Sequence, residues 1–87
     1  MKVLYGKLVE KRIKKHKLPK EIWEDFRDTF ESFAQTRNFR LFDIKRLIQK
    51  GPHTYYRLRI RGYRALFRMD DQHIYVEDIA PRGEVYR

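Results

Sequence analysis

The sequence predicts one α+β domain over residues 1–87, in which a strand and two helices precede an antiparallel meander and the helices cover one face of the sheet. Three observations predict it. Apolar residues recur at steps of three and four up to Phe33, the period changes to two after Phe42, and turn-forming pairs divide the later segment. Hydrophobic residues make up 41% of the chain and aromatic residues 15%, which is enough for a core and excludes a disordered basic tail.

The first half of the chain predicts a short strand and two helices. Lys2–Tyr5 forms the expected edge strand, and residues 7–16 carry apolar side chains at helical spacing. Pro19 suits the first turn of the second helix, because the N–H group that it lacks would be unpaired there. We expect this helix to end near residues 36–39, where Asn38 adopts the left-handed conformation. Its broad apolar face consists of Ile22, Trp23, Phe26, Phe30 and Phe33.

Alternating side chains predict the strands of the second half. Residues 43–48 form the first of these strands, and the Gly-Pro pair at residues 51–52 forms the turn that follows. The next two strands meet at residues 61–62, an Arg-Gly pair where we expect a tight hairpin turn. Residues 70–72 turn the chain again before a last strand around residues 74–76. The inward positions of the two middle strands are Tyr56, Leu58 and Ile60, then Tyr63, Ala65, Phe67 and Met69.

Pleating decides which side chains of the two middle strands share a face. With the apolar positions in the core, Arg57 and Arg59 point to the other side of the sheet. A turn at residues 61–62 places Arg59 opposite Arg64 and Arg57 opposite Leu66. Directly opposed like charges destabilise a strand pair by roughly a few tenths of a kcal/mol or more.

The positive charge is large and unevenly distributed. The formal net charge is +9, which favours binding to polyanions such as phosphate backbones. Between Asp43 and Asp70 the sequence contains no acidic residue. The basic residues of this block are Lys45, Arg46, Lys50, Arg57, Arg59, Arg61, Arg64 and Arg68.

Two hypotheses explain this basic block. Extending the strand register across the second hairpin brings Tyr75 beside Arg68 and Glu77 beside Leu66. The face is then either an ordinary solvated surface, partly neutralised by Glu77, or a concave cradle for an anion. Arginine suits a cradle, because its planar guanidinium group binds two phosphate oxygens at once and keeps its charge.

Other features of the sequence exclude several classes of protein. There is no cysteine, which excludes a disulfide framework and a thiolate metal site and fits a reducing cytoplasm. Residues 1–10 alternate between apolar and polar side chains, unlike a signal peptide or a membrane span. We therefore expect a cytoplasmic protein with no membrane partner.

Four short motifs follow one another in the second half of the chain. They are residues 56–60 (YRLRI), 62–67 (GYRALF), 74–76 (IYV) and 82–86 (RGEVY). In this order and spacing they resemble the RelE/ParE toxin superfamily. The first half of the chain agrees with that superfamily only in the order of its helices. The resemblance implies a RelE-like fold, with two N-terminal helices packed on a twisted antiparallel β-sheet.

The resemblance also implies a function. RelE-like toxins bind the ribosomal A site and cleave mRNA there, with a RelB-like antitoxin as their partner. The 2′-hydroxyl group attacks the adjacent phosphate and leaves a cyclic phosphate and a free 5′-hydroxyl. Neither a metal nor another cofactor is implied. Such chemistry needs a base for the 2′-hydroxyl, positive charge around the phosphorane and an acid for the leaving oxygen.

The matching positions imply a role for each of five residues. Arg64 corresponds to the arginine that stabilises the phosphate, and Arg82 to a second one near the C-terminus. Tyr86 corresponds to the tyrosine that orients the substrate or stacks on a base. Arg57 and Arg59 stand where many members of the superfamily carry lysines that serve in proton transfer and charge stabilisation. Arginine, with a pKa above about 12, is a poor general base.

Other residues are candidates for proton transfer or RNA binding. His53 is a possible general base, because its unperturbed pKa of about 6.5 suits proton transfer. Several candidates also have a structural explanation. Tyr86 could anchor the C-terminus, Arg82 could pair with Glu84 or the terminal carboxylate, and the lysines near residues 11–17 could form a solvated helix face. The candidate RNA-binding residues are Lys45, Arg61, Arg68, Lys11, Lys14 and Lys15.

Two other functions compete with the nuclease. A ParE-like inhibitor of DNA gyrase shares the superfamily but performs no catalysis. A plain nucleic-acid-binding module requires only the basic face, and it would show steep salt dependence without cleavage. The joint presence of Arg64, Arg82 and Tyr86 favours the nuclease, whereas arginine in place of lysine at positions 57 and 59 keeps the alternatives open.

Overall fold

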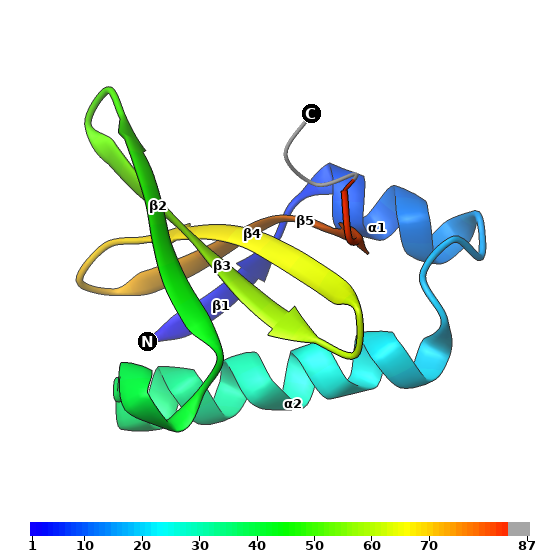
Figure 1. Cartoon of the computed structure of the whole chain (residues 1–87), viewed down its shortest axis with the longest axis horizontal. Helices are drawn as coiled ribbons and strands as arrows, with labels where there is room; N and C mark the ends of the chain where they lie inside the picture. The colour runs from blue at the N-terminus through cyan, green and yellow to red at the C-terminus, as the bar shows by residue number, and fades with distance from the viewer. Residues whose placement is uncertain (84–87) are drawn as a thin grey trace.

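The computed structural model describes residues 1–83, apart from the side chains of residues 48 and 50. Within this range a five-stranded sheet has two helices and a short 3-10 helix beside it (Figure 1). No helix in the described range is long and apolar enough to cross a membrane. The elements are β1 (Lys2–Tyr5), α1 (Lys7–Lys14), α2 (Lys20–Thr36), η1 (Phe39–Leu41), β2 (Ile44–Lys50), β3 (His53–Ile60), β4 (Tyr63–Met69) and β5 (His73–Pro81).

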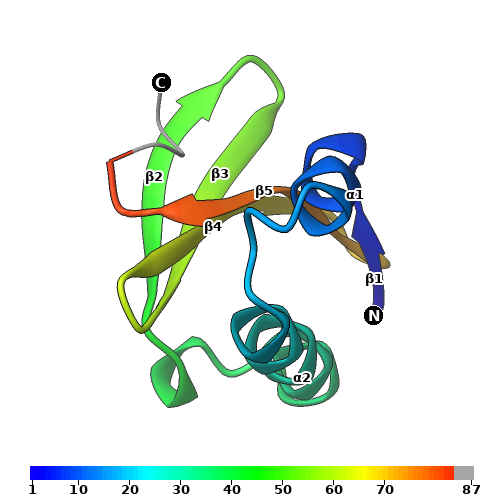
Figure 2. The ribbon, with the colours of Figure 1, turned by 90° about the vertical axis from the view of Figure 1, so that its right-hand side faces the viewer.

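The strand order across the sheet is β1-β5-β4-β3-β2. The prediction of a purely antiparallel sheet is wrong, because β1 pairs with β5 in parallel, with Val3 opposite Ile74. The other three pairings are antiparallel, as the meander predicts. β1 and β2 are the two edge strands, and α2 lies beneath the sheet, seen nearly end-on in Figure 2.

The ends of both helices differ slightly from those expected. α1 ends at Lys14, and His16 adopts a positive φ of 56° shortly after it. α2 begins directly after Pro19, as predicted. At its other end Arg37 has the left-handed conformation, so the assignment of this role to Asn38 is wrong. The Asn38 side chain instead accepts a hydrogen bond from the backbone N–H of Arg40 and caps η1.

The core lies between α2 and the sheet face that it covers. Phe26, Phe30 and Phe33 project from α2 and are almost fully buried, as the spacing of the apolar residues predicts. The rings of Phe30 and Phe67 meet edge to face, with centroids 5.2 Å apart. Such aromatic pairs contribute about 1 kcal/mol beyond the burial of their surface. Leu58 and other apolar residues of the sheet complete this core.

The predicted β3–β4 hairpin is confirmed in its turn and in its register. Arg61 and Gly62 have positive φ values of 50° and 81°, which suit a two-residue turn between twisted strands. Arg59 pairs with Arg64. The turn after β4 is also confirmed, and Asp70 Oδ1 accepts hydrogen bonds from two backbone N–H groups of that turn.

The β4–β5 pairing contains a bulge that the sequence did not predict. The register shifts between Leu66 and Phe67, so Phe67 faces Val76 whereas Leu66 faces Asp78. Glu77 is the extra residue, and its predicted position beside Leu66 is therefore wrong. A bulge of this kind redirects the side chains that follow it. Asp78 consequently lies buried in the sheet beside α1.

An ion pair fastens α1 to β5. Arg12 Nε donates to Asp78 Oδ1 at 2.7 Å, and Arg12 Nη2 donates to Asp78 Oδ2 at 3.2 Å. The Arg12 side chain is only 20% exposed and that of Asp78 only 10%. Two parallel hydrogen bonds of this type fix both distance and direction. Through this contact α1 lies against β5 on the side of the sheet opposite α2 (Figure 2). The prediction that both helices cover the same face is therefore wrong.

Replacing Arg12 should destabilise the protein measurably. Arg12→Met keeps much of the aliphatic chain but leaves the Asp78 carboxylate buried without its arginine, which should lower the free energy of unfolding by about 2 kcal/mol. Chemical denaturation measures this change. Arg27→Met is the matched control, because the Arg27–Asp28 pair is largely exposed and its loss should cost less than about 0.5 kcal/mol. Equal effects of the two substitutions would contradict the anchoring role of Arg12.

Candidate nucleic-acid interface

The sheet face turned away from α2, called here the open face, carries most of the candidate residues. Strand pairing arranges its side chains in rows that run across the sheet. One row joins Lys45, Arg57 and Leu66, and its neighbour joins Arg59 and Arg64. A third row lies further along the strands and consists of Tyr55, Arg68, Tyr75 and Leu4.

Three of the predicted catalytic residues meet in the middle of the open face. Arg59 lies directly opposite Arg64, and Arg57 precedes Arg59 by two positions on the same side of β3. We call Arg57, Arg59 and Arg64 the arginine cluster. Arg57 and Arg64 are partly buried, whereas Arg59 is exposed. The cluster confirms that pleating brings these guanidinium groups to one face.

A carboxylate that the sequence analysis did not assign lies inside this cluster. Asp43 Oδ1 accepts a hydrogen bond from Arg57 Nη1 at 3.0 Å, and Asp43 Oδ2 accepts one from Arg59 Nε at 2.9 Å. The hydrogen bond from Arg57, followed by that from Arg59, holds the pKa of Asp43 below its ordinary value. The open face therefore carries a negative charge among its positive ones. Asp43 stands two residues before Lys45, and alternate residues of a strand share a face. This spacing could have predicted that Asp43 lies on the open face.

The remaining two predicted catalytic residues lie in or near the C-terminal segment. The backbone N–H of Arg82 donates to the carbonyl oxygen of Gly62 at 2.9 Å. Arg82 is thereby held at the β3–β4 turn, near the end of β4 that carries Arg64, and it is exposed. Tyr86 lies outside the described residues, as does Glu84, the predicted partner of Arg82.

His53 lies far from the arginine cluster. It is the first residue of β3, six positions before Arg59, which corresponds to about 20 Å along a strand. It is exposed beside the β2–β3 turn, and its ring lies near that of Tyr55, with centroids 6.5 Å apart. A general base must reach its proton within hydrogen-bonding distance or through one water molecule. The structure does not bring His53 to the phosphate site that the cluster would form.

The candidate RNA-binding residues are divided between three places. Lys45 is exposed on the open face, opposite Arg57. Arg61 points towards α2 instead, with its Nη2 atom 3.4 Å from Asp25 Oδ2. Lys11, Lys14 and Lys15 are exposed on α1, at the β5 side of the sheet.

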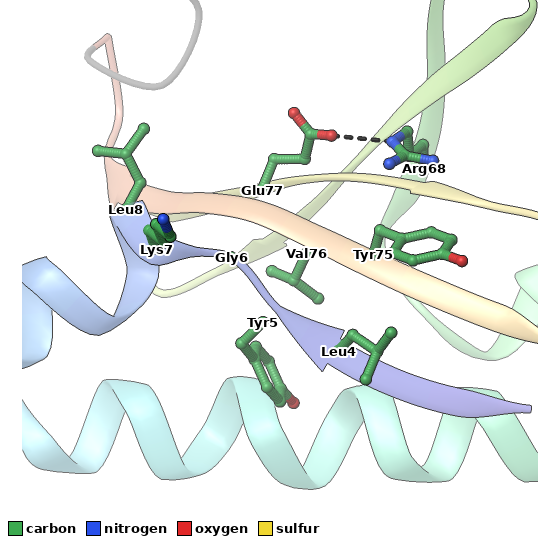
Figure 3. A pocket seen from close by; sticks show the side chains of 9 residues that line it. All are labelled: Leu4, Tyr5, Gly6, Lys7, Leu8, Arg68, Tyr75, Val76 and Glu77. Atoms are coloured by element: carbon green, nitrogen blue, oxygen red, sulfur yellow. Dashed lines mark hydrogen bonds and ion pairs between the residues drawn. The ribbon is translucent and has the colours of Figure 1, made fainter.

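Arg68 belongs to a separate group near β1. Its Nε donates to Glu77 Oε1 at 2.9 Å, and its guanidinium carbon lies 4.3 Å from the centre of the Tyr75 ring. A cavity of about 420 Å³ opens here, and Figure 3 shows its lining, including Leu4 and Leu8, with Arg68 and Glu77 on the side away from α2. Burial raises the pKa of Tyr5 at the base of this cavity to about 12.

Residues 1–83 contain no group of three histidine, aspartate or glutamate side chains placed to hold a metal ion. The arginine cluster combines three permanent cations with one carboxylate. Guanidinium groups bind the oxygens of a phosphate and stabilise added negative charge, but they do not accept protons near neutral pH. The chemistry that this arrangement supports is therefore anion binding and charge stabilisation.

The pKa of Asp43 provides a test of the ion pairs in this cluster. Because its pKa is lower in the folded chain than in the unfolded one, these pairs stabilise the fold above the ordinary pKa and lose that effect as the pH falls through the lowered value. A carbon-detected NMR titration should find Asp43 ionising below its ordinary value of 3.8. In Arg57→Met the pKa should rise, and in the distant control Arg27→Met it should not change. An unshifted Asp43 in the unmodified protein would refute the pairing.

Comparisons with known proteins bear on the fold. No family model matches the sequence, and no curated protein sequence matches it. Two solved structures are similar over 95% of the chain. One is the archaeal RelE–RelB complex from Pyrococcus horikoshii OT3, with 27% identity, 96% of that chain covered and a TM-score of 0.74. The other is the RelB–RelE antitoxin–toxin complex from Methanococcus jannaschii, with 26% identity, 94% covered and a TM-score of 0.72. The chain therefore has a RelE-like fold.

Proposed function

We propose that this chain is the toxin of a RelE–RelB-type toxin–antitoxin pair and that it cleaves mRNA on the ribosome without a metal ion. The arginine cluster carries the proposal, because the strand register brings three arginines together on the face of a RelE-like fold that turns away from α2. Similarity to two RelE–RelB complexes over almost the whole chain supports the toxin assignment. A cytoplasmic location follows from the proposed target.

The proposed reaction is a transesterification within the RNA chain. The 2′-oxygen forms a bond to the adjacent phosphorus, the bond from phosphorus to the 5′-oxygen breaks, and the products are a 2′,3′-cyclic phosphate and a 5′-hydroxyl. Negative charge grows on the non-bridging oxygens during this step. In the proposal Arg64 and Arg59 face each other across these oxygens, with Arg57 beside them. Removing one such charge-stabilising group from an active site commonly lowers the rate by about 10²–10³-fold.

The other predicted residues have supporting roles in this proposal. Arg82 lies near the Arg64 end of the cluster and is positioned to contact a neighbouring phosphate. Tyr86 orients or stacks on the substrate. Lys45 and the lysines of α1 attract the RNA backbone from either side of the cluster, with an affinity that falls as salt is added. His53 is not included, because of its distance along β3.

The proposed partner is a RelB-like antitoxin. Both similar structures are complexes with RelB. The chain carries a net charge of +9 and an open basic face, which suits an acidic segment that folds on binding. Covering the arginine cluster with such a segment would block access to RNA.

One observation favours a second candidate, a basic RNA-binding module without catalysis. Among residues 1–83 no side chain with a pKa suited to a general base lies next to the arginine cluster, where Asp43 is held ionised by two arginines. General bases typically accelerate proton transfer by about 10²–10⁴-fold. A site that only stabilises charge would cut slowly or would bind without cutting.

The main test compares mRNA cleavage by the unmodified protein with cleavage by the Arg64→Ala variant. In a purified translation system the unmodified protein should cut mRNA at the A-site codon, and Arg64→Ala should cut it about 100-fold more slowly or not at all. Primer extension on the mRNA locates and quantifies the cuts. Arg27→Ala is the control, because it also removes one arginine but lies on α2, and it should retain full activity. Thermal melting checks that each variant is folded.

The other outcomes decide between the alternatives. Intact mRNA at every codon in the presence of folded protein would rule out the nuclease. Inhibition of DNA supercoiling by gyrase under the same conditions would then assign a ParE-like activity. Salt-dependent RNA binding with neither effect would assign a binding module.

A further inference from the structure

Asp43 is the one carboxylate in direct contact with the arginine cluster among the described residues. It uses a different oxygen for each arginine, Oδ1 for Arg57 and Oδ2 for Arg59. Its backbone is also fixed, because its carbonyl oxygen accepts hydrogen bonds from the Arg59 backbone N–H at 3.1 Å and from Arg57 Nη1 at 3.4 Å. The carboxylate is therefore held in place by the strand pairing and by both of its partners.

The two arginines keep most of their hydrogen-bond donors despite this contact. A guanidinium group has five N–H donors in a planar fork. Arg57 gives Asp43 hydrogen bonds from Nη1 only, and Arg59 gives one from Nε only. Among the described residues, no hydrogen bond is made by Nη1 or Nη2 of Arg59. A phosphate can thus bind the outer edge of Arg59 while Asp43 stays where it is.

Among the described residues, the cluster without Asp43 would contain only like charges. Arg59 lies directly opposite Arg64, a pairing that repels in a strand ladder. Long arginine side chains relieve such repulsion by spreading into solvent, which removes the geometry that a reacting phosphate needs. Arg57 shows the opposite behaviour, since its side chain is only 13% exposed.

We infer that Asp43 is a positioning residue of the proposed nuclease site, which holds the guanidinium groups of Arg57 and Arg59 side by side and stays bound to them when RNA is present. This inference rests on the proposed function. It differs from a gate, in which the carboxylate would occupy the phosphate position and would leave when RNA arrives.

Replacing Asp43 by asparagine separates positioning from simple charge. Asp43→Asn keeps the size of the side chain and raises the local charge by one. Its saturating single-turnover cleavage rate on translating ribosomes should fall by about tenfold or more, because misplaced catalytic groups lose their orientation. The protein concentration at half-saturation should not rise. Binding to a non-cleavable 2′-O-methyl RNA should be as tight as before or tighter, since a negative charge is gone.

Two further variants serve as controls. Asp43→Glu keeps the charge and should recover the rate to within about threefold of the unmodified protein, because the longer carboxylate still reaches both arginines. Asp28→Asn makes the same change in net charge on α2, where Asp28 pairs with Arg27, and should alter neither rate nor binding. Thermal melting of each variant shows whether it is folded.

A measurement on the unmodified protein covers the case in which Asp43→Asn does not fold. The Nε–H signal of Arg59 should keep its position and its slow exchange with water when the 2′-O-methyl RNA is added, because Asp43 stays bound to it. Release of this proton on RNA binding would overturn the inference.

The outcomes for cleavage separate the two proposals. If the unmodified protein does not cut mRNA, the proposed function and this inference fail together. If it cuts and Asp43→Asn cuts equally fast or faster, only the inference fails. Slower cutting together with weaker RNA binding would also overturn it, because the substitution would then impair RNA binding in general rather than the alignment of the bound phosphate.

Discussion

The hydrogen-bond register between β3 and β4 decides which side chains meet on each face of the sheet. A shift by one residue would move Leu58 and Ala65 out of the core and turn the arginines towards α2. The turn contributes to this register but does not enforce it, since Arg61 has a positive φ that costs a residue other than glycine about 1 kcal/mol. Burial on the α2 side has the greater effect, because each large apolar side chain contributes about 1.5–3 kcal/mol. The core therefore imposes the charged arrangement on the opposite face.

The two faces of the sheet thus differ in what they contribute. Phe30 and Phe33 of α2, together with Phe67 of β4, give the fold its stability. The Arg59–Arg64 pairing on the other side costs roughly a few tenths of a kcal/mol, and the exposed contacts with Asp43 offset only part of it. A domain with this core tolerates that cost. Placing like charges where they do not favour folding is typical of residues retained for binding.

How much of this the sequence could reveal depends on how local each signal is. The apolar face of α2 and the hairpin at residues 61–62 follow from side chains a few positions apart, and both are confirmed. The parallel pairing of β1 with β5 joins the two ends of the chain and has no local signature. The bulge beside Phe67 shifts the register of β5, where α1 also packs, and the alternation of side chains does not reveal it.

In the candidate site, too, the sequence predicted the local relations along the strands but not the contacts between distant segments. Arg57, Arg59 and Arg64 meet as the pleat predicts. Arg61 departs because a turn residue with positive φ no longer follows the alternation of the strand, and it meets Asp25 on α2. Asp43 was missed because it stands at the boundary of the basic block, where a count along the sequence places it outside. Strand pairing places it inside.

The carboxylate of Asp43 accounts for the presence of arginine rather than lysine at positions 57 and 59. A lysine has a single compact ammonium group, so a carboxylate bound to it would cover much of the charge offered to RNA. A guanidinium group is a planar fork, and it can bind Asp43 with one N–H while presenting others to a phosphate. The resemblance to toxins with lysines at these positions therefore does not extend to proton transfer. On this face the chain has the groups to hold a phosphate and to stabilise its charge. In the proposed reaction, the proton that leaves the 2′-oxygen must be taken by a group other than Arg57, Arg59 or Arg64.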